Sequence, residues 1–405
     1  MIKKFQDTFK PNVGAENFFL SILVWGIATG CFAAVLNNYL SDVRHIDEME
    51  RGILEFFREM PGLLLVFLIA AMHKYTDWKI LKVGTMVSMI GLAGLMFASD
   101  KILITGLIMV WSAGEHIILP IRSSIAMHVA QEGKLGRSLG MVTGAANAGS
   151  VTGSIIAAII FYLGTRHWEV ANELTLYNLA WGLVLLLLVG SLIVIFTAKT
   201  DEVKTKRPRL YFHRKYMKFY ALELFYGARK QIFLTFAPYV LIRIYGMDTK
   251  SMAVLLGICA LANIYCAPMI GKLTDYIGYK NVMIYDTIIL FFVCLIYGFA
   301  DSLFAKQIAM WMVCLNFMLD AIISTSSMAS NIYVRDISAN EEEITASLTT
   351  GISINHLISI LAALMGGIVW KYVGVGWLFS FAAIMALGNS AFALTIPAPK
   401  KQKTA

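Results

Sequence analysis

Long apolar stretches recur along the whole chain, and they constrain the fold more than any other feature. Each has about 18 to 25 residues, enough for a helix to cross a hydrocarbon core of roughly 30 Å. Charged residues make up only 15% of the chain, whereas a soluble domain carries about 25%. Because lipid cannot hydrogen-bond the backbone, these stretches are expected to be helices. The sequence therefore predicts an all-α integral membrane protein in a lipid bilayer.

Twelve transmembrane helices are expected, in two blocks of six. The expected ranges are 17–40, 51–73, 79–98, 102–128, 138–164 and 175–198, and then 216–243, 250–270, 280–300, 304–332, 343–370 and 375–396. The longest and most basic polar segment separates the blocks. The predicted organisation is an N-terminal six-helix bundle (1–198), a cytoplasmic basic linker (199–215), a C-terminal six-helix bundle (216–398) and a cytoplasmic tail (399–405).

The net charge of +8 does not indicate nucleic-acid binding, because the basic residues lie between apolar stretches rather than on one soluble face. They are better explained as topology signals. With both termini in the cytoplasm, about 22 basic residues lie on the inner side and about 8 on the outer side. Short loops favour a bacterial inner (plasma) membrane.

The two blocks also resemble each other. Ser112–Val129 aligns without a gap to Phe317–Val334, which matches Glu115 to Asp320, each followed after one residue by Ile-Ile. Two six-helix halves related in this way place a solute site at their interface, near the bilayer midplane.

The segment Gly271-Lys-Leu-Thr-Asp275-Tyr-Ile-Gly278-Tyr-Lys280 resembles the signature loop of the major facilitator superfamily, and the resemblance extends over essentially the whole chain. It implies a fold of two pseudo-symmetric bundles, transport by alternating access and a monomer. It also implies a cytoplasmic loop that latches the halves, in which Gly271 permits close helix approach.

The first half departs from the family pattern. Alignment of Lys79 with Lys280 puts Ala70 at the glycine and Lys74 at the aspartate of the signature loop. The stretch 138–164 has glycines but lacks the Gly-Pro pair of drug antiporters, and no glycine-rich run follows Arg122. These departures argue against drug–proton antiport, which stays an alternative.

Ionisable groups within spans are costly and mark pathways or relays by default. At a rise of 1.5 Å per residue, Glu115, Asp320 and Arg229 fall near the midplane. Glu115 and Asp320 are therefore candidate proton-coupling residues, together with His116 beside Glu115. The alternative for Glu115 is a fixed ion pair with an arginine or histidine.

Arg229 and Lys230 are adjacent cations near the midplane and need a counter-ion, for which an anionic solute is one candidate. The planar fork of arginine suits carboxylate or phosphate. The alternative is an interhelical ion pair of Arg229 with Glu223, Glu115 or Asp320. The full set of expected substrate-binding residues is Arg229, Lys230, Tyr226, Gln231, Arg122, His356 and Asn147.

The stretch 51–73 opens with a charged cluster, in which Arg58 lies three residues after Glu55 and next to Glu59. That spacing permits pairing along a helix. We expect these residues, with Gly271, Asp275, Gly278 and Lys280, to act in gating. A solvated vestibule face is the alternative for Glu55, Arg58 and Glu59.

These features predict a secondary active transporter of a small organic solute, anionic and coupled to a proton or another ion. A multidrug or lipid exporter of the same fold is the alternative, and a non-transporting sensor is a further one. No Walker-type loop, HExxH or GxSxG pattern is present, so an ATPase or ordinary hydrolase is not expected. The five cysteines lack CxxC spacing, and no metal or cofactor is expected.

Overall fold

A computed structural model describes residues 5–11, 14–72, 74–132, 134–166, 173–198, 212–339 and 341–397. Most of the predicted linker and the whole predicted tail lie outside these residues. The described chain is helical almost throughout and contains no strand longer than an isolated bridge between Phe9 and Ala130.

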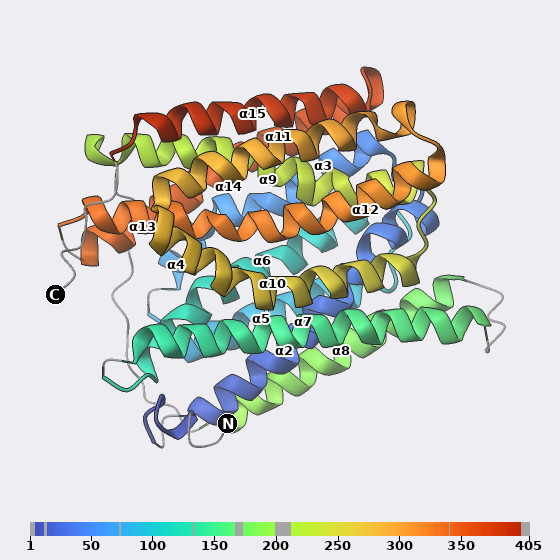
Figure 1. The fold of residues 1–405 in the computed structure, drawn as a ribbon. Helices are drawn as coiled ribbons and strands as arrows, with labels where there is room; N and C mark the ends of the chain where they lie inside the picture. Colours follow the sequence, from blue (N-terminus) through green and yellow to red (C-terminus); the bar gives the residue numbers. More distant parts are fainter. Residues whose placement is uncertain are drawn as a thin grey trace. The chain divides into compact units, whose positions relative to one another are not determined.

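Helices occupy each of the first six expected ranges (Figure 1). They are α2 (Ala15–Asn38) with the π-helix η1 (Tyr39–Val43), α3 (Glu48–Leu63) with α4 (Leu65–Ala71), α5 (Asp77–Leu95), α6 (Lys101–His128), α7 (Leu135–Arg166) and α8 (Glu173–Thr197).

Helices also occupy the second six ranges. They are the 3₁₀ turn η2 (Arg214–Tyr216) with α9 (Met217–Tyr239) and the π-helix η3 (Val240–Ile244), α10 (Thr249–Ile277), α11 (Tyr279–Leu303), α12 (Lys306–Ile323) with the 3₁₀ turn η4 (Ser324–Ser327) and α13 (Met328–Ile337), α14 (Glu341–Tyr372) and α15 (Val375–Thr395).

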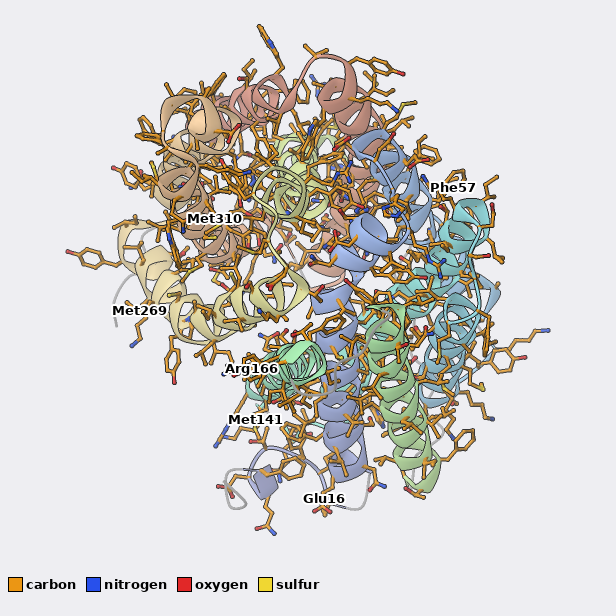
Figure 2. All side chains as sticks on the ribbon, turned by 90° about the vertical axis from the view of Figure 1, so that its right-hand side faces the viewer. Glu16, Phe57, Met141, Arg166, Met269 and Met310 are labelled. Carbon is orange, nitrogen blue, oxygen red and sulfur yellow. The ribbon has the colours of Figure 1, made fainter. Side chains whose placement is uncertain are left out.

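Ten helical segments in the described chain are long and apolar enough to cross a membrane. The expected spans outside this set are 51–73 and 216–243, which hold α3 and α9. Both carry several charged side chains, and charges within a membrane need partners. Large apolar side chains such as Phe57 and Met269 point outward (Figure 2), as expected of a lipid-facing surface. The polar helices α3 and α9 are therefore where a functional site is to be sought.

The chain divides into two compact units. Unit 1 comprises Met1–His45, Leu64–Arg207 and Asp248–Leu261, and unit 2 comprises Ile46–Leu63, Pro208–Met247 and Ala262–Ala405. Helix α3 therefore belongs to unit 2, although it comes from the first half of the sequence. The predicted division of the sequence at 198 and 216 stays a prediction.

In unit 1, α2 packs against α7 and α8, and α5 packs against α6. The contact of α2 with α7 depends on small residues, because a Cβ atom at Gly149 or Gly153 would collide with the backbone of α2. The side chain of Ser191 on α8 donates a hydrogen bond of 3.0 Å to the carbonyl of Ser21 on α2. Close backbone approach through glycine is a common way of joining helices in membranes.

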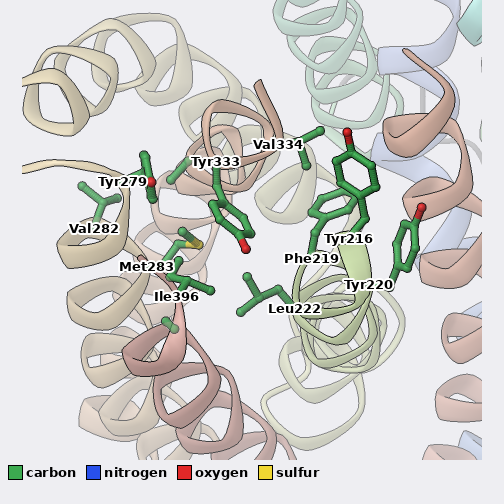
Figure 3. Close-up of a cluster of buried hydrophobic side chains, with 12 residues drawn as sticks. Tyr216, Phe219, Tyr220, Leu222, Tyr279, Val282, Met283, Tyr333, Val334 and Ile396 are labelled. Atoms are coloured by element: carbon green, nitrogen blue, oxygen red, sulfur yellow. The ribbon is translucent and has the colours of Figure 1, made fainter. Parts of the chain in front are cut away.

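In unit 2, α9 packs against α14, α15 and α3, and α11 packs against α12, α13 and α15. One end of this unit is closed by a cluster of buried apolar and aromatic side chains (Figure 3). Tyr216 and Phe219 come from the start of α9, Tyr279 from the start of α11, and Tyr333 from α13. This core fixes the ends of α9 and α11, and so positions the polar side chains further along both helices.

The internal repeat is visible in the backbone as well as in the sequence. The first helix of each block ends in a π-helix, Tyr39–Val43 after α2 and Val240–Ile244 after α9. Such segments are rare and are often found at functional sites. The two aligned carboxylates also take matching places, Glu115 on α6 and Asp320 on α12.

Candidate functional site

Glu55 is the centre of a buried polar network in unit 2. It is fully buried, and its carboxylate accepts hydrogen bonds from Nη1 of Arg51 (2.5 Å) and from Nε of Arg58 (2.8 Å). Nε2 of Gln231 on α9 donates a further bond of 2.9 Å to the same carboxylate. Gln231 is itself fully buried and also bonds to Thr235. A buried carboxylate is tolerated only with such partners, because an unpaired charge away from water is very costly.

Glu59 extends this network to α14. Nη2 of Arg58 donates to one oxygen of Glu59 at 2.9 Å, and Nδ1 of His356 lies 2.9 Å from the other. A carboxylate can only accept, so this ring nitrogen carries the hydrogen. The network therefore joins α3, α9 and α14 through polar side chains that are almost entirely buried. We name Arg51, Glu55, Arg58, Glu59, Gln231 and His356 the α3 network.

The start of α3 explains why the network forms where it does. Asp47 and Glu50 each accept a hydrogen bond from the other's backbone N–H, at 2.8 and 2.9 Å. This reciprocal cap begins the helix and sets the positions of the side chains that follow. Asp47 is also bonded to Lys371 at 2.7 Å, and Glu48 to Arg243 at 3.4 Å. These outer pairs are partly exposed, unlike the α3 network.

Arg229 is the centre of a second cluster, on the opposite face of α9 from Gln231. Only 3% of Arg229 is exposed. Its guanidinium lies 5.0 Å from the ring of Tyr226 and 3.8 Å from the carboxylate of Asp320 on α12. Asp286 on α11 is near enough to interact with it electrostatically. The Nε and Nη1 atoms are buried and have no hydrogen-bond partner among the described residues.

This second cluster is loosely paired. A distance of 3.8 Å is beyond a normal hydrogen bond, so Asp320 balances the charge of Arg229 without satisfying its N–H groups. Asp286 accepts a hydrogen bond from Ser326 of η4 through Oδ2, while its Oδ1 is buried without a partner in the described chain. We name Arg229, Asp320, Asp286, Tyr226 and Ser326 the arginine cluster.

A third carboxylate, Glu223, lies near the start of α9. It accepts hydrogen bonds of 3.2 Å from Ser330 on α13 and from Asn355 on α14. Lys230, two turns further along α9, is within electrostatic reach of both Glu223 and Glu59. The two adjacent cations of α9 therefore have different surroundings, Lys230 near Glu59 and Glu223 and Arg229 near Asp320 and Asp286.

The remaining predicted residues lie in unit 1. Nδ1 of His116 lies 2.8 Å from the carbonyl of Ser112 on α6. Glu115 is partly buried on the same helix. The guanidinium of Arg122 stacks over the ring of Trp25 at 5.7 Å. Asn147 is exposed on α7.

The signature loop joins α10 to α11. Gly278 has a φ of +84°, which favours glycine, and directly precedes α11. Lys280 donates hydrogen bonds to the carbonyls of Leu394 and Ile396 at 2.8 and 2.9 Å, and so caps the end of α15. Asp275 lies near the end of α10, and its side chain is outside the described residues.

The expected role of Gly271 in close helix approach is wrong. A Cβ atom at this position would meet only the sulfur of Met328, at an ordinary contact distance of 3.7 Å. A larger side chain than hydrogen is therefore accommodated there, and the close helix contacts of unit 2 are made at other glycines, such as Gly227 against Asn355.

Sequence reasoning missed three members of these clusters. Arg51 lies one helical turn before Glu55, a spacing that predicts an ion pair. Asp286 is a carboxylate inside the apolar range 280–300, which is by itself a signal of function. Thr235 gave no such signal, because hydroxyl groups are common in membrane helices.

Comparisons with known proteins agree with this architecture. The model of the Major Facilitator Superfamily matches residues 17–354, whereas comparison with curated proteins gives no significant match. Among solved structures, the nucleoside transporter NupG superimposes with a TM-score of 0.74 at 11% identity, covering 95% of this chain and 100% of that one.

Two other solved structures are similar at the level of the fold. A peptide transporter POT mutant bound to alafosfalin has a TM-score of 0.71 at 11% identity, with 94% of each chain covered. A bacterial homologue of the human lysosomal transporter Spinster has a TM-score of 0.66 at 13% identity, covering 94% of this chain and 95% of that one. With the family model matching most of its length, this chain belongs to the Major Facilitator Superfamily of membrane transporters.

Proposed function

We propose that the protein is a proton-coupled secondary transporter of a small organic solute that carries a carboxylate. Arg229 holds the carboxylate, and Asp320 exchanges the proton. The observation that carries this proposal is the state of Arg229, which is 3% exposed, 3.8 Å from Asp320, and without a hydrogen-bond partner for its Nε and Nη1.

The unpartnered N–H groups support an anionic ligand. A buried polar hydrogen without an acceptor costs about 1–3 kcal/mol, and more for a charged group. The Nε and Nη1 hydrogens of a guanidinium belong to its planar donor fork, which suits two parallel hydrogen bonds to a carboxylate. A solute carboxylate at this position relieves the cost that the protein alone leaves unpaid.

The loose ion pair supports coupling to a proton. While Asp320 is ionised, it balances the charge of Arg229 and competes with an anionic solute. Protonation of Asp320 removes this competitor and leaves Arg229 as a cation without a close counter-ion. Proton binding and anion binding then favour each other, and linkage makes this coupling reciprocal.

The α3 network fits a gating role in this proposal. Four charged side chains of α3 are held by one another and by Gln231 and His356. Alternating access requires contacts of this kind to form and separate as the halves move around the site. Glu115 and His116 on α6 remain candidates for additional proton exchange, and Arg122 and Asn147 for additional solute contacts.

The proposal is tested by thermal unfolding of purified protein in detergent, with organic carboxylates, sugars and lipophilic cations as ligands. A ligand at 100 times its Kd stabilises the folded state by about 2.7 kcal/mol. We expect carboxylates to stabilise the wild type and not Arg229→Gln. Arg335→Gln is the matched control, because Arg335 is an exposed arginine on α13 of the same unit.

Proton coupling needs a separate measurement in proteoliposomes. We expect uptake of the stabilising carboxylate to be driven by an inward proton gradient in the wild type. Asp320→Asn is expected to lose acceleration by the gradient while still binding the solute. The proposal fails if lipophilic cations alone stabilise wild type and Arg229→Gln equally, which would instead indicate an exporter.

A further inference from the structure

We propose that the solute also carries a cationic amine, and that Asp286 binds it. The inferred class of solute is thus a zwitterion with both an ammonium and a carboxylate group. This inference rests on the proposed function, because Arg229 is the anchor of the carboxylate. It adds a second subsite and a residue that the sequence did not single out.

Asp286 has the features of an unfilled acceptor. It lies on α11, and its Oδ2 is held by the hydroxyl of Ser326 in the 3₁₀ turn between α12 and α13. Its Oδ1 is buried and has no hydrogen-bond partner among the described residues. An ammonium group offers three donors and a full positive charge, and therefore suits an ionised carboxylate oxygen in such surroundings.

The cations of the protein leave Asp286 without a full counter-ion. The cation that acts on it is Arg229, which also lies 3.8 Å from Asp320. Lys230 is the next residue along α9, but it is within electrostatic reach of Glu59 and Glu223. One arginine is thus shared between two carboxylates, and the cluster of Arg229, Asp320 and Asp286 has one positive and two negative charges when all are ionised.

The charge balance favours a zwitterion over a simple anion. With a proton on Asp320, the remaining charges are Arg229 (+1) and Asp286 (−1). A monoanion bound to Arg229 leaves the negative charge of Asp286 unpaired, and an uncompensated buried charge costs several kcal/mol. A zwitterion is neutral overall, pairs its carboxylate with Arg229 and its ammonium with Asp286, and leaves no charge without a partner.

The test compares three ligands with one carbon skeleton: leucine, 4-methylpentanoate, which lacks the amine, and 3-methylbutylamine, which lacks the carboxylate. Matching sets built on phenylalanine and on the dipeptide Ala-Ala extend it to other sizes. Ligand-induced thermal stabilisation is measured at several concentrations. We expect at least one zwitterion to half-saturate the wild type at a concentration at least tenfold lower than either of its two partial analogues.

Asp286→Asn provides the variant, and Asp301→Asn is the matched control, since Asp301 is an exposed carboxylate near the end of the same helix. We expect Asp286→Asn to bind the zwitterion and the amine-free carboxylate equally well. Arg229→Gln is expected to lose both responses, and Asp301→Asn to behave as the wild type.

The outcomes separate the two proposals. If the amine-free carboxylates stabilise the wild type as well as the zwitterions do, the amine subsite is wrong and the carboxylate anchor stands. If neither class stabilises the wild type, both proposals are overturned. The comparison of ligands on the wild type decides the matter even if Asp286→Asn does not fold, because it needs no substitution.

Discussion

At the scale of single residues, the burial of Glu55 makes the strongest prediction about stability. Glu55→Gln removes the negative charge that Arg51 and Arg58 share and leaves two arginines facing a neutral amide. Removal of one partner from a buried ion pair costs about 3–5 kcal/mol. We expect a markedly lower melting temperature for Glu55→Gln in detergent.

Glu48→Gln is the matched control, because it changes the same residue type on the same helix. The pair of Glu48 with Arg243 is partly exposed, with 38% of the arginine side chain accessible. Exposed pairs contribute about 0–1 kcal/mol, so this variant is expected to melt close to the wild type. Equal melting temperatures for the two variants would show that the α3 network contributes no more than a surface pair.

Glu343, at the start of α14, predicts a dependence of stability on pH. Its carboxylate accepts hydrogen bonds from the hydroxyl of Tyr216 (2.7 Å), the backbone of Ala339 (3.1 Å) and Lys215 (3.2 Å). The Tyr216 hydrogen bond is the main cause that lowers its pKa from 4.5 to about 2. A lowered pKa in the folded state stabilises the protein above the unfolded pKa, and this contribution is lost as pH falls through the folded one.

We therefore expect wild type to melt above Glu343→Gln at neutral pH, and the difference to shrink between pH 4.5 and about 2. Melting temperatures of both proteins across this range check the prediction. Glu16→Gln serves as control, because Glu16 is exposed on α2 (Figure 2) and its replacement should give a small difference at every pH. A difference between wild type and Glu343→Gln that stays constant with pH would contradict the assigned hydrogen bonds.

At the scale of elements, the contact between α2 and α7 depends on Gly153. Its Cβ position is filled by the backbone of Ile27 and Cys31 on α2, and a backbone atom cannot move aside as a side chain can. Gly153→Val is expected to separate the helices and destabilise the protein by about 1–3 kcal/mol, the usual range for overpacking.

Gly144 on the same helix provides the comparison, because a Cβ atom there meets nothing within 4 Å. Gly144→Val is expected to melt near the wild type, while Gly153→Val melts lower. Both variants are measured by thermal unfolding in the same detergent. If Gly144→Val were the less stable of the two, the packing of α7 against α2 would be wrong.

The helices themselves were predictable from sequence, because each follows from a long apolar run bounded by polar residues. The ranges 79–98 and 280–300 correspond to α5 (Asp77–Leu95) and α11 (Tyr279–Leu303), within a few residues at each end. The interruption of the range 304–332 by η4 was not predicted, because hydropathy does not distinguish an α-helix from a 3₁₀ turn.

At the scale of the whole molecule, local pairs were predictable and distant ones were not. The bond between Glu55 and Arg58 follows from their spacing of three residues on one helix. The bond between Glu59 and His356 joins positions 297 residues apart, and no local pattern indicates it. Arg229 with Asp320 was one of three pairings left open, and only the packing of α9 and α12 selected it.

The orientation in the membrane is the remaining prediction about the whole molecule, and it follows from the distribution of lysine and arginine. Lys134 follows the first four expected spans and should face the cytoplasm. Lys306 precedes α12, after nine expected spans, and should face outward. Both are exposed outside the helix cores, so each can be replaced by cysteine and labelled with a membrane-impermeant maleimide in intact cells.

We expect Lys306→Cys to be labelled in intact cells and Lys134→Cys only after the membrane is permeabilised. The native cysteines give a low background, because four of the five are buried and the fifth, Cys266, is partly buried; wild type measures that background. Labelling of both variants in intact cells would contradict the odd number of spans expected between them. The reverse pattern would keep the number of spans and invert the orientation, which places the basic loops outside.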